Sequence, residues 1–247
     1  IRAQLERGDD LDDVHGLAWD MHYRRSTGPL YSMKEATRPV AELQSWVEGL
    51  FDLQASVDSP AAQALRKHMS ELSPAAVKPF MEDLTRYTLY SHGTHVAGIA
   101  AAKNPAAKLM VCRFEGDAKM IPEPPTMEDA LNIASGAKET VAYFKKHGVR
   151  VVNMSWVIPR SSIEGALEQN GIGTPEERKQ TAREQFEVMK KGLEEAFRSA
   201  PEILFVGGAG NSNNDVQFDE FIPPMFVMPN LMIAGAVDQA GEATNFT

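Results

Sequence analysis

Residues 203–211 of this 247-residue chain read ILFVGGAGN. The first four residues are large and apolar, as in a strand buried in a protein core, and the next four are glycine or alanine. A change from bulky apolar residues to glycines is typical of a strand that runs into a tight turn. The run therefore predicts a core strand whose carboxyl end opens into a small-residue loop that ends at Asn211.

The segments around this strand alternate between helix and strand. Apolar runs at 149–155, 231–237 and 108–114 predict three further strands, and residues 127–147 have helical periodicity. Another helix is expected to begin at Thr174, where Thr-Pro-Glu-Glu combines an N-cap, a proline in the first turn and a capping-box glutamate. This alternation, with strands that are continuously apolar, predicts an α/β fold: a three-layer parallel sheet with helices on both faces.

The amino-terminal part of the sequence has a different residue pattern. Residues 32–88 show helical periodicity interrupted by Pro60, Pro74 and Pro79, which predicts a helical insertion made of short helices. Further along, the polar, glycine-containing segment 158–174 predicts a loop.

Composition limits the classes of function. A net charge of −9 opposes nucleic-acid binding, which needs clustered lysine and arginine, and no apolar run reaches the ~18 residues of a membrane span. The single cysteine, Cys112, cannot form an internal disulfide, and its apolar surroundings favour a small buried side chain over a nucleophile.

The most specific chemical signal is SHGTHVAG at residues 91–98. A histidine at the start of a helix of small residues can stand exposed in a cleft, as a general base must, so His92 is a candidate base. His92 and His95 also have the spacing of metal ligands on one helical face, although the His-Glu-x-x-His pattern is absent and no third ligand is near. A structural histidine pair is the third interpretation.

Two other strand ends carry polar or small residues. The run at 151–156, VVNMSW, ends in Ser155 and Trp156, and its backbone can pair with an extended peptide. Gly208 and Gly210 leave space for a substrate beside Asn211, whose amide can donate a hydrogen bond to a developing oxyanion. Taken alone, an ordinary buried strand end is the favoured explanation of the first run, and a glycine turn with a turn-forming asparagine explains the second at least as well.

Together the three segments resemble the subtilases, the serine proteases of peptidase family S8, in the order in which that family carries them. The resemblance implies that His92 is the general base and that Asn211 is the oxyanion donor. It also implies that Ser155 and Trp156 flank the primary substrate pocket. A fourth segment, residues 9–20, resembles the loop that follows the catalytic aspartate in larger bacterial subtilases.

Two parts of the family pattern are not found. The nearest match to the aspartate motif is VDSP at 57–60, but no apolar strand precedes Asp58 and Pro60 replaces the glycine, so Asp58 is rejected. The nucleophile string Gly-Thr-Ser-Met-Ala does not occur. We therefore expect residues 1–247 to be the central part of a subtilase catalytic domain, with the aspartate and the serine outside the chain, and to be inactive alone.

These observations favour a serine endopeptidase that hydrolyses polypeptides, secreted or held in the cell envelope as the resemblance implies. The alternatives are a peptide-binding pseudoprotease and a metal-dependent hydrolase that uses the two histidines. We expect no cofactor. Calcium is conceivable at the acidic cluster, but a solvated loop is favoured because the EF-hand spacing is absent; the cluster consists of Asp9, Asp10, Asp12 and Asp13.

Overall fold

The structure is a computed structural model. It describes residues 38–54, 56–112, 118–213, 215, 218–244 and 246–247. The chain divides into two compact units, residues 1–122 and 123–247, and each is described by itself.

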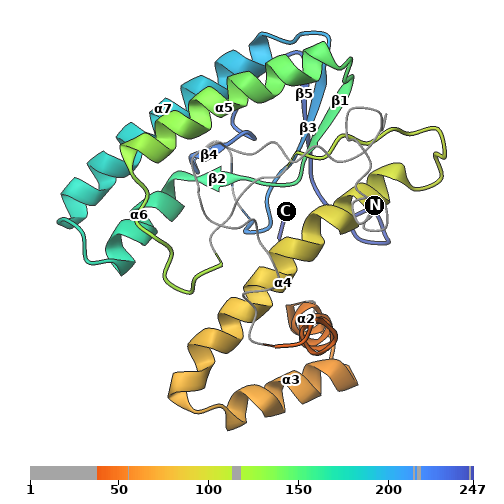
Figure 1. Ribbon diagram of the computed structural model, residues 1–247, viewed down its shortest axis with the longest axis vertical. Helices are drawn as coiled ribbons and strands as arrows, with labels where there is room; N and C mark the ends of the chain where they lie inside the picture. The colour runs from red at the N-terminus through yellow and green to blue at the C-terminus, as the bar shows by residue number, and fades with distance from the viewer. Residues whose placement is uncertain (1–37, 55, 113–117, 214, 216–217, 245) are drawn as a thin grey trace, which may run out of the picture. The chain divides into compact units, whose positions relative to one another are not determined.

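The first unit is helical in its described residues. It consists of α2 (Val40–Gln54), α3 (Pro60–Glu71) and α4 (Pro74–Ala101), with α3 and the first turns of α4 packed on α2 (Figure 1). The apolar positions expected to share one face of the first helix do face the core. Leu43 and Val47 are buried, and Leu50 and Leu53 pack against them. The remaining buried members of this cluster are Leu65, Phe80 and Leu84.

Two of the three prolines begin helices, as the sequence predicts. Pro60 and Pro74 each occupy the first turn of a helix, where a missing amide hydrogen costs nothing. Ser59 caps α3, because its hydroxyl accepts a hydrogen bond from the amide of Ala62 at 3.0 Å. Pro79 lies inside α4, close to its start, and the helix continues past it.

The long helix α4 corrects one expectation. The sequence predicts that His92 lies at the start of a short helix, whereas it lies within a helix that is continuous from Pro74 to Ala101. Residues 84–91 contain no proline or glycine that would end a helix, and one interior glycine costs only about 1 kcal/mol. Gly93 is therefore insufficient to break it.

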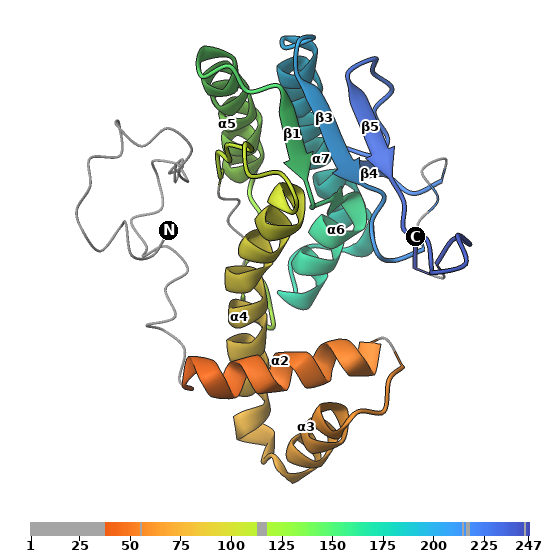
Figure 2. The ribbon, with the colours of Figure 1, turned by 90° about the vertical axis from the view of Figure 1, so that its right-hand side faces the viewer.

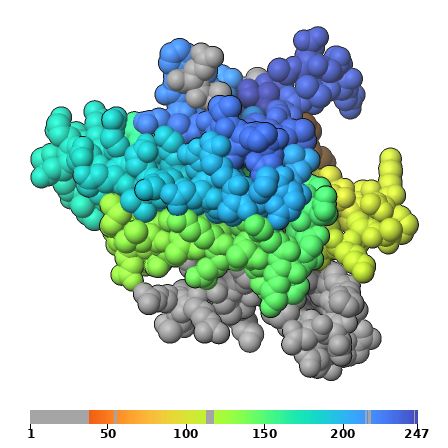
Figure 3. Space-filling view, turned by 90° about the horizontal axis from the view of Figure 1, so that it is seen from above, coloured from red at the N-terminus to blue at the C-terminus, as the bar shows by residue number. Residues whose placement is uncertain are grey.

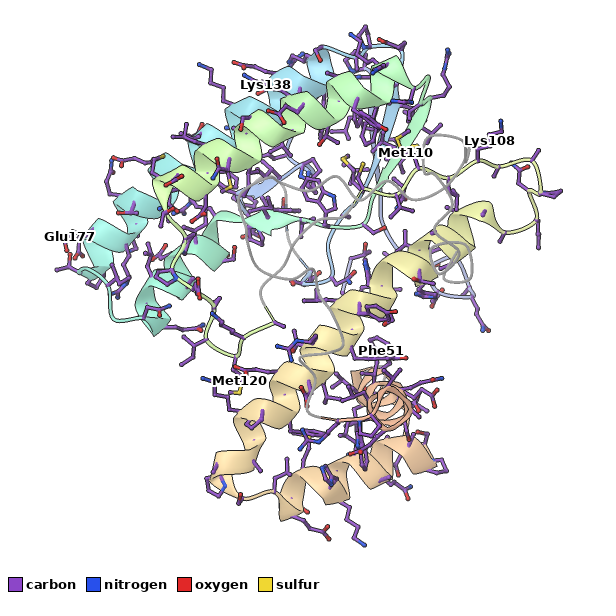
Figure 4. The ribbon with its side chains drawn as sticks, viewed as in Figure 1. Phe51, Lys108, Met110, Met120, Lys138 and Glu177 are labelled. Carbon is purple, nitrogen blue, oxygen red and sulfur yellow. The ribbon has the colours of Figure 1, made fainter. Side chains whose placement is uncertain are left out.

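The strand predicted at 108–114 is also wrong in its described part. Residues 108–112 have no regular secondary structure, and residues 113 and 114 lie outside the described part of the chain. A strand needs a neighbour to accept and donate its backbone hydrogen bonds, and the described residues of the first unit contain no other strand. This connecting segment contacts α4 further on, where the Met120 amide donates to Glu82 Oε1 at 3.1 Å (Figure 4).

The second unit has the predicted alternation. Its elements in order are α5 (Met127–Lys146), β1 (Val151–Met154), β2 (Ile158–Pro159), α6 (Arg160–Gln169), α7 (Pro175–Arg198), β3 (Leu204–Gly208), β4 (Phe221–Ile222) and β5 (Leu231–Ala234). Strands β1, β3 and β5 form a parallel sheet in that order, and β2 pairs antiparallel with β4. The α/β class and the parallel sheet are thus confirmed.

Helices α5 and α7 lie on one face of this sheet and side by side (Figures 2 and 3). Phe197 of α7 stacks on Phe205 of β3 with ring centroids 4.3 Å apart. Between the helices the contact is tight, because a Cβ built on Gly192 would lie 2.3 Å from the Cβ of Ala134. Lys138 of α5 also pairs with Glu195 of α7 at 2.6 Å, which lowers the pKa of that carboxyl.

Among the described residues of the second unit, no helix covers the opposite face of the sheet. Exposure alternates along each strand, and three large apolar side chains on this face are exposed: Val151 at 59%, Leu204 at 39% and Met232 at 51%. The pairs Val151↔Leu204 and Val206↔Met232 place them on the same side. Helices on both faces therefore remain a prediction.

Residues 158–174, predicted as a loop, contain β2 and α6, so that prediction is wrong. The helix buries Ile163, Ala166 and Leu167, which are spaced three and four residues apart. This spacing is helical periodicity, which can be read from the sequence and predicts a helix here. Two of the three glycines of the segment follow the helix, where Gly171 and Gly173 have φ of +68° and +69°, and the third, Gly165, lies within it.

Candidate functional site

The carboxyl ends of β1 and β3 bring together the residues predicted to bind substrate. The strands are parallel with Met154 opposite Gly207, so Ser155 and Gly208 follow at neighbouring positions on the same edge. Ser155 is exposed, and its hydroxyl accepts a hydrogen bond from Asn153 Nδ2 at 2.9 Å. In parallel sheets, reactive groups collect beyond this edge.

The loop after β3 is built from small residues with a defined backbone. The amide of Ala209 donates to the carbonyl of Ala234 at 2.9 Å, which extends the pairing of β3 with β5. Gly210 has φ of +98°, a conformation that side chains disfavour. Among the described residues, a Cβ built on Gly208 would meet no atom within 4 Å. Asn211 follows with an exposed side chain.

The small sheet formed by β2 and β4 connects these two strand ends. Trp156 is half-buried, and two residues later Ile158 pairs with Ile222. Pro223, which follows Ile222 in the chain, is buried. Its Cγ lies 3.6 Å from the position that a Cβ on Gly207 would occupy. The segments that follow β1 and β3 are therefore held through one shared element, β4.

His92 is placed in the first unit, whereas Ser155, Trp156, Gly208, Gly210 and Asn211 are in the second. Its side chain is exposed, and so is that of His95 on the same stretch of α4.

Gly93 and Gly98 of the SHGTHVAG run lack side chains, so we expect a neighbouring backbone to pack closely against them. Within the described residues of the first unit, a Cβ at either position would meet no atom within 4 Å. That expectation is therefore not met inside this unit.

Asp58 has local partners. Its carboxylate pairs with Arg66 at 2.6 Å and accepts a hydrogen bond from Gln63 Nε2 at 3.1 Å. It precedes Ser59, the N-cap of α3, so the VDSP string starts a helix.

The remaining candidates for site chemistry are groups of metal-binding side chains and the thiol of Cys112. The described part of the chain has no group of three or more histidine, cysteine, aspartate or glutamate side chains arranged to hold a metal ion. The acidic cluster at residues 9–13, and the segment 9–20, lie outside the described residues. Burial raises the pKa of the Cys112 thiol to about 11, so at neutral pH the thiol is protonated and a poor nucleophile.

The sequence model of the family described as the subtilase family matches residues 69–247. The chain belongs to the subtilase family. The match covers well over half of the chain, including the His92 motif and Asn211, and it begins after α2 and most of α3. No curated protein and no solved structure matches the chain.

Membership in the subtilase family establishes a serine-peptidase type of protein with an α/β fold and a polypeptide as the class of substrate. No helix in the described residues has the length and apolar character needed to cross a bilayer.

Sequence reasoning missed two residues beside the strand ends, Arg160 and Glu220. Arg160 Nε donates to Glu220 Oε2 at 2.5 Å, and the Arg160 amide donates to the Glu220 carbonyl at 2.8 Å. The two residues are 60 positions apart, and only the pairing of β2 with β4 brings them together. A single sequence carries no signal for such a contact.

Proposed function

We propose that this protein is a serine endopeptidase that cleaves peptide bonds through an acyl-enzyme. His92 takes the proton of the nucleophilic serine and returns it to the leaving amine. Asn211 donates a hydrogen bond to the oxyanion of the tetrahedral intermediate. The observation that carries the proposal is the subtilase match over a segment that contains both residues in the family's motifs.

The substrate pocket is proposed at the edge where β1 and β3 end. Ser155 and Trp156 form one wall, and Gly208 and Gly210 form the other. The parallel register that makes Ser155 and Gly208 neighbours supports this assignment, as does the open space above Gly208. A peptide needs such space, because its backbone must approach the loop closely.

The nucleophile and the orienting aspartate are assigned to residues outside 1–247. This part of the proposal rests on the absence of the string Gly-Thr-Ser-Met-Ala from the chain and on the helix-start position of Asp58. We also propose that helices cover the second face of the sheet in the complete domain. The exposed apolar side chains of Val151, Leu204 and Met232 support that arrangement, because large apolar side chains side by side favour burial.

A fluorophosphonate probe, which forms a covalent adduct with an activated serine, tests the proposal. The full-length protein should be labelled, and a protein restricted to residues 1–247 should not. A covalent adduct on any serine within 1–247 would contradict the assignment of the nucleophile.

Substitutions then test the two assigned roles. In the full-length protein, His92→Ala should lower kcat by about 10⁴-fold or more, with His95→Ala as the matched control on the same helix. Asn211→Ala should lower kcat by about 10²–10³-fold, the loss known for one oxyanion donor in subtilisin itself, with little change in KM. Equal effects of His92→Ala and His95→Ala would remove His92 from the base role.

The second candidate is a pseudoprotease that binds peptides without cleaving them, which the missing serine string favours. A full-length protein that binds peptides, is not labelled by the probe and hydrolyses nothing would establish it. Secretion or envelope attachment is proposed for either function, and fractionation of the producing cells with an antibody to this chain checks it.

A further inference from the structure

A partly exposed ion pair joins the residue that follows β2 to the residue that precedes β4. The guanidinium of Arg160 and the carboxylate of Glu220 are 24% and 34% exposed and 2.5 Å apart. The same two residues share a backbone hydrogen bond of 2.8 Å, which prolongs the two-residue pairing of β2 with β4. Side chains and main chain thus join the same two segments twice.

These two segments continue into the two proposed pocket walls. Upstream of Arg160, β2 leads back through Trp156 to Ser155. Downstream of Glu220, β4 leads to buried Pro223, which contacts the Gly207 position next to Gly208. The spacing between the walls therefore depends on how firmly β2 is held to β4.

Burial of Phe221 and Ile222 anchors β4, whereas β2 is only half-buried and its backbone pairing with β4 is short. A ladder of two residues per strand provides few backbone hydrogen bonds, and such ribbons are marginal without further packing. Helix α6 begins at Arg160 without a side-chain cap on its first turn. Arg160 also lies 3.7 Å from Glu164 one turn later, so its guanidinium lies between two carboxylates and is oriented by both.

We propose that the Arg160–Glu220 pair positions the substrate-binding walls and thereby fixes which side chain the primary pocket accepts. The inference rests on the proposed function for the location of the pocket. Both residues are positioning residues: neither touches the substrate, and their effect passes through the β2–β4 pair to Ser155, Trp156 and Gly208.

The test uses the full-length protein and a series of peptides that differ only in the size of the residue before the scissile bond. In Arg160→Met, the ratio of kcat/KM between the best and the poorest peptide should fall by about tenfold, the range that one methylene controls in a fitted pocket. The change should appear in KM, because His92 and Asn211 are untouched. The charge swap Arg160→Glu with Glu220→Arg, combined with Glu164→Gln to remove the carboxylate that lies 3.7 Å from Arg160, restores an opposite-charge pair and should recover the ratio.

The control is Arg198→Met, which breaks an ion pair with Glu194 of 2.7 Å on α7. An unchanged ratio in a folded Arg160→Met protein, or an equal change in Arg198→Met, would overturn the inference. Glu220→Gln and Arg160→Lys are milder variants. If both fail to fold, the pair is a stability element, and the positioning role is refuted.

Dissociation constants for the same peptides separate this inference from the proposed function. A wild-type protein that binds the peptides selectively without cleaving them removes the protease assignment and leaves the positioning role standing, provided that Arg160→Met changes the selectivity of binding. If that variant binds all peptides with wild-type selectivity, the positioning role fails whether or not the protein cleaves.

Discussion

The two units of the chain bury their apolar residues differently. In the first, a small cluster around Phe80 holds α2, α3 and the first turns of α4, whereas none of residues 85–101 is buried. In the second, Phe197 of α7 stacks on Phe205 of β3, and α5 and α7 lie on one face of the sheet (Figure 2). The α4 segment that carries His92 has no buried residue after Leu84, whereas the strands that end at the proposed substrate-binding edge rest on a packed core.

The same difference separates the residues assigned to the proposed site. Ser155 and Asn211 come after strands, and Gly208 ends one; the register of these strands is fixed by backbone pairing and by the packing of Phe205. His92 lies on a helical surface beside other exposed side chains, including Ile99 at 64% exposed. A core fixes geometry because its side chains interlock, and an exposed helix surface lacks that constraint.

The largest losses of stability are expected from substitutions that delete a buried ring from the core of one unit at a time. Phe205→Ala deletes a fully buried ring that stacks on Phe197, and Phe80→Ala deletes a fully buried ring of the first unit. Each should cost about 3–5 kcal/mol of unfolding free energy in its own unit. Hydrogen exchange resolved by peptide should lose protection in the substituted unit. Loss of protection in both units with either variant would show that they fold as one.

The next largest loss of stability is expected from a substitution at the contact between α5 and α7. Gly192→Ala places a methyl group 2.3 Å from the Cβ of Ala134, and overpacking of this kind costs about 1–3 kcal/mol. Gly165→Ala, in the interior of α6 with open space around it, is the matched control and should stabilise by about 0.5–1 kcal/mol. Urea denaturation measures both, and equal effects would contradict the close approach of the helices.

A smaller difference in stability is expected between substitutions at a helix start of the second unit and one of the first. Thr174 caps α7 in a reciprocal capping box with Glu177, whereas Ser73 at the start of α4 makes no side-chain cap bond. Thr174→Ala should cost about 1 kcal/mol, and Ser73→Ala should cost clearly less in thermal denaturation.

The same capping box gives a pH dependence. Hydrogen bonds from the Thr174 amide and hydroxyl lower the pKa of Glu177. Its stabilisation is therefore present above the pKa of the unfolded chain and is lost as the pH falls through the lowered folded value. Glu177→Gln should remove this acid dependence, and an unchanged acid limb of the stability curve would contradict it.

The smallest effect on stability is expected at Cys112. Since burial raises its pKa from 9.0 to about 11, its contribution to stability is present below pH 9 and is lost as the pH rises towards 11. Alkylation by iodoacetamide at pH 8 should be about 100-fold slower than in the unfolded chain, because two pKa units lower the thiolate fraction by that factor. Equal rates in the folded and unfolded protein would show that the thiol is exposed.

Local sequence patterns determined much of this protein. The Thr174–Glu177 capping box, the turn at Gly148 with φ of +67°, the strand at Leu204 and the helix-starting prolines all follow from residues within one turn of one another. The motif around His92 and the AGN run at 209–211 were enough to name the family. Short-range steric and hydrogen-bonding preferences act within a few residues, so a single sequence displays them.

Tertiary structure decided the rest. Which sheet face is covered and the pairing of Arg160 with Glu220 depend on residues distant in sequence. Asn230 is an example: its buried amide donates to the carbonyls of Phe197 and Ala200, both at 3.0 Å, and so satisfies the end of a helix 30 residues earlier. Whether a side chain is buried or bonded is a property of the space around it, and folding the whole chain creates that space.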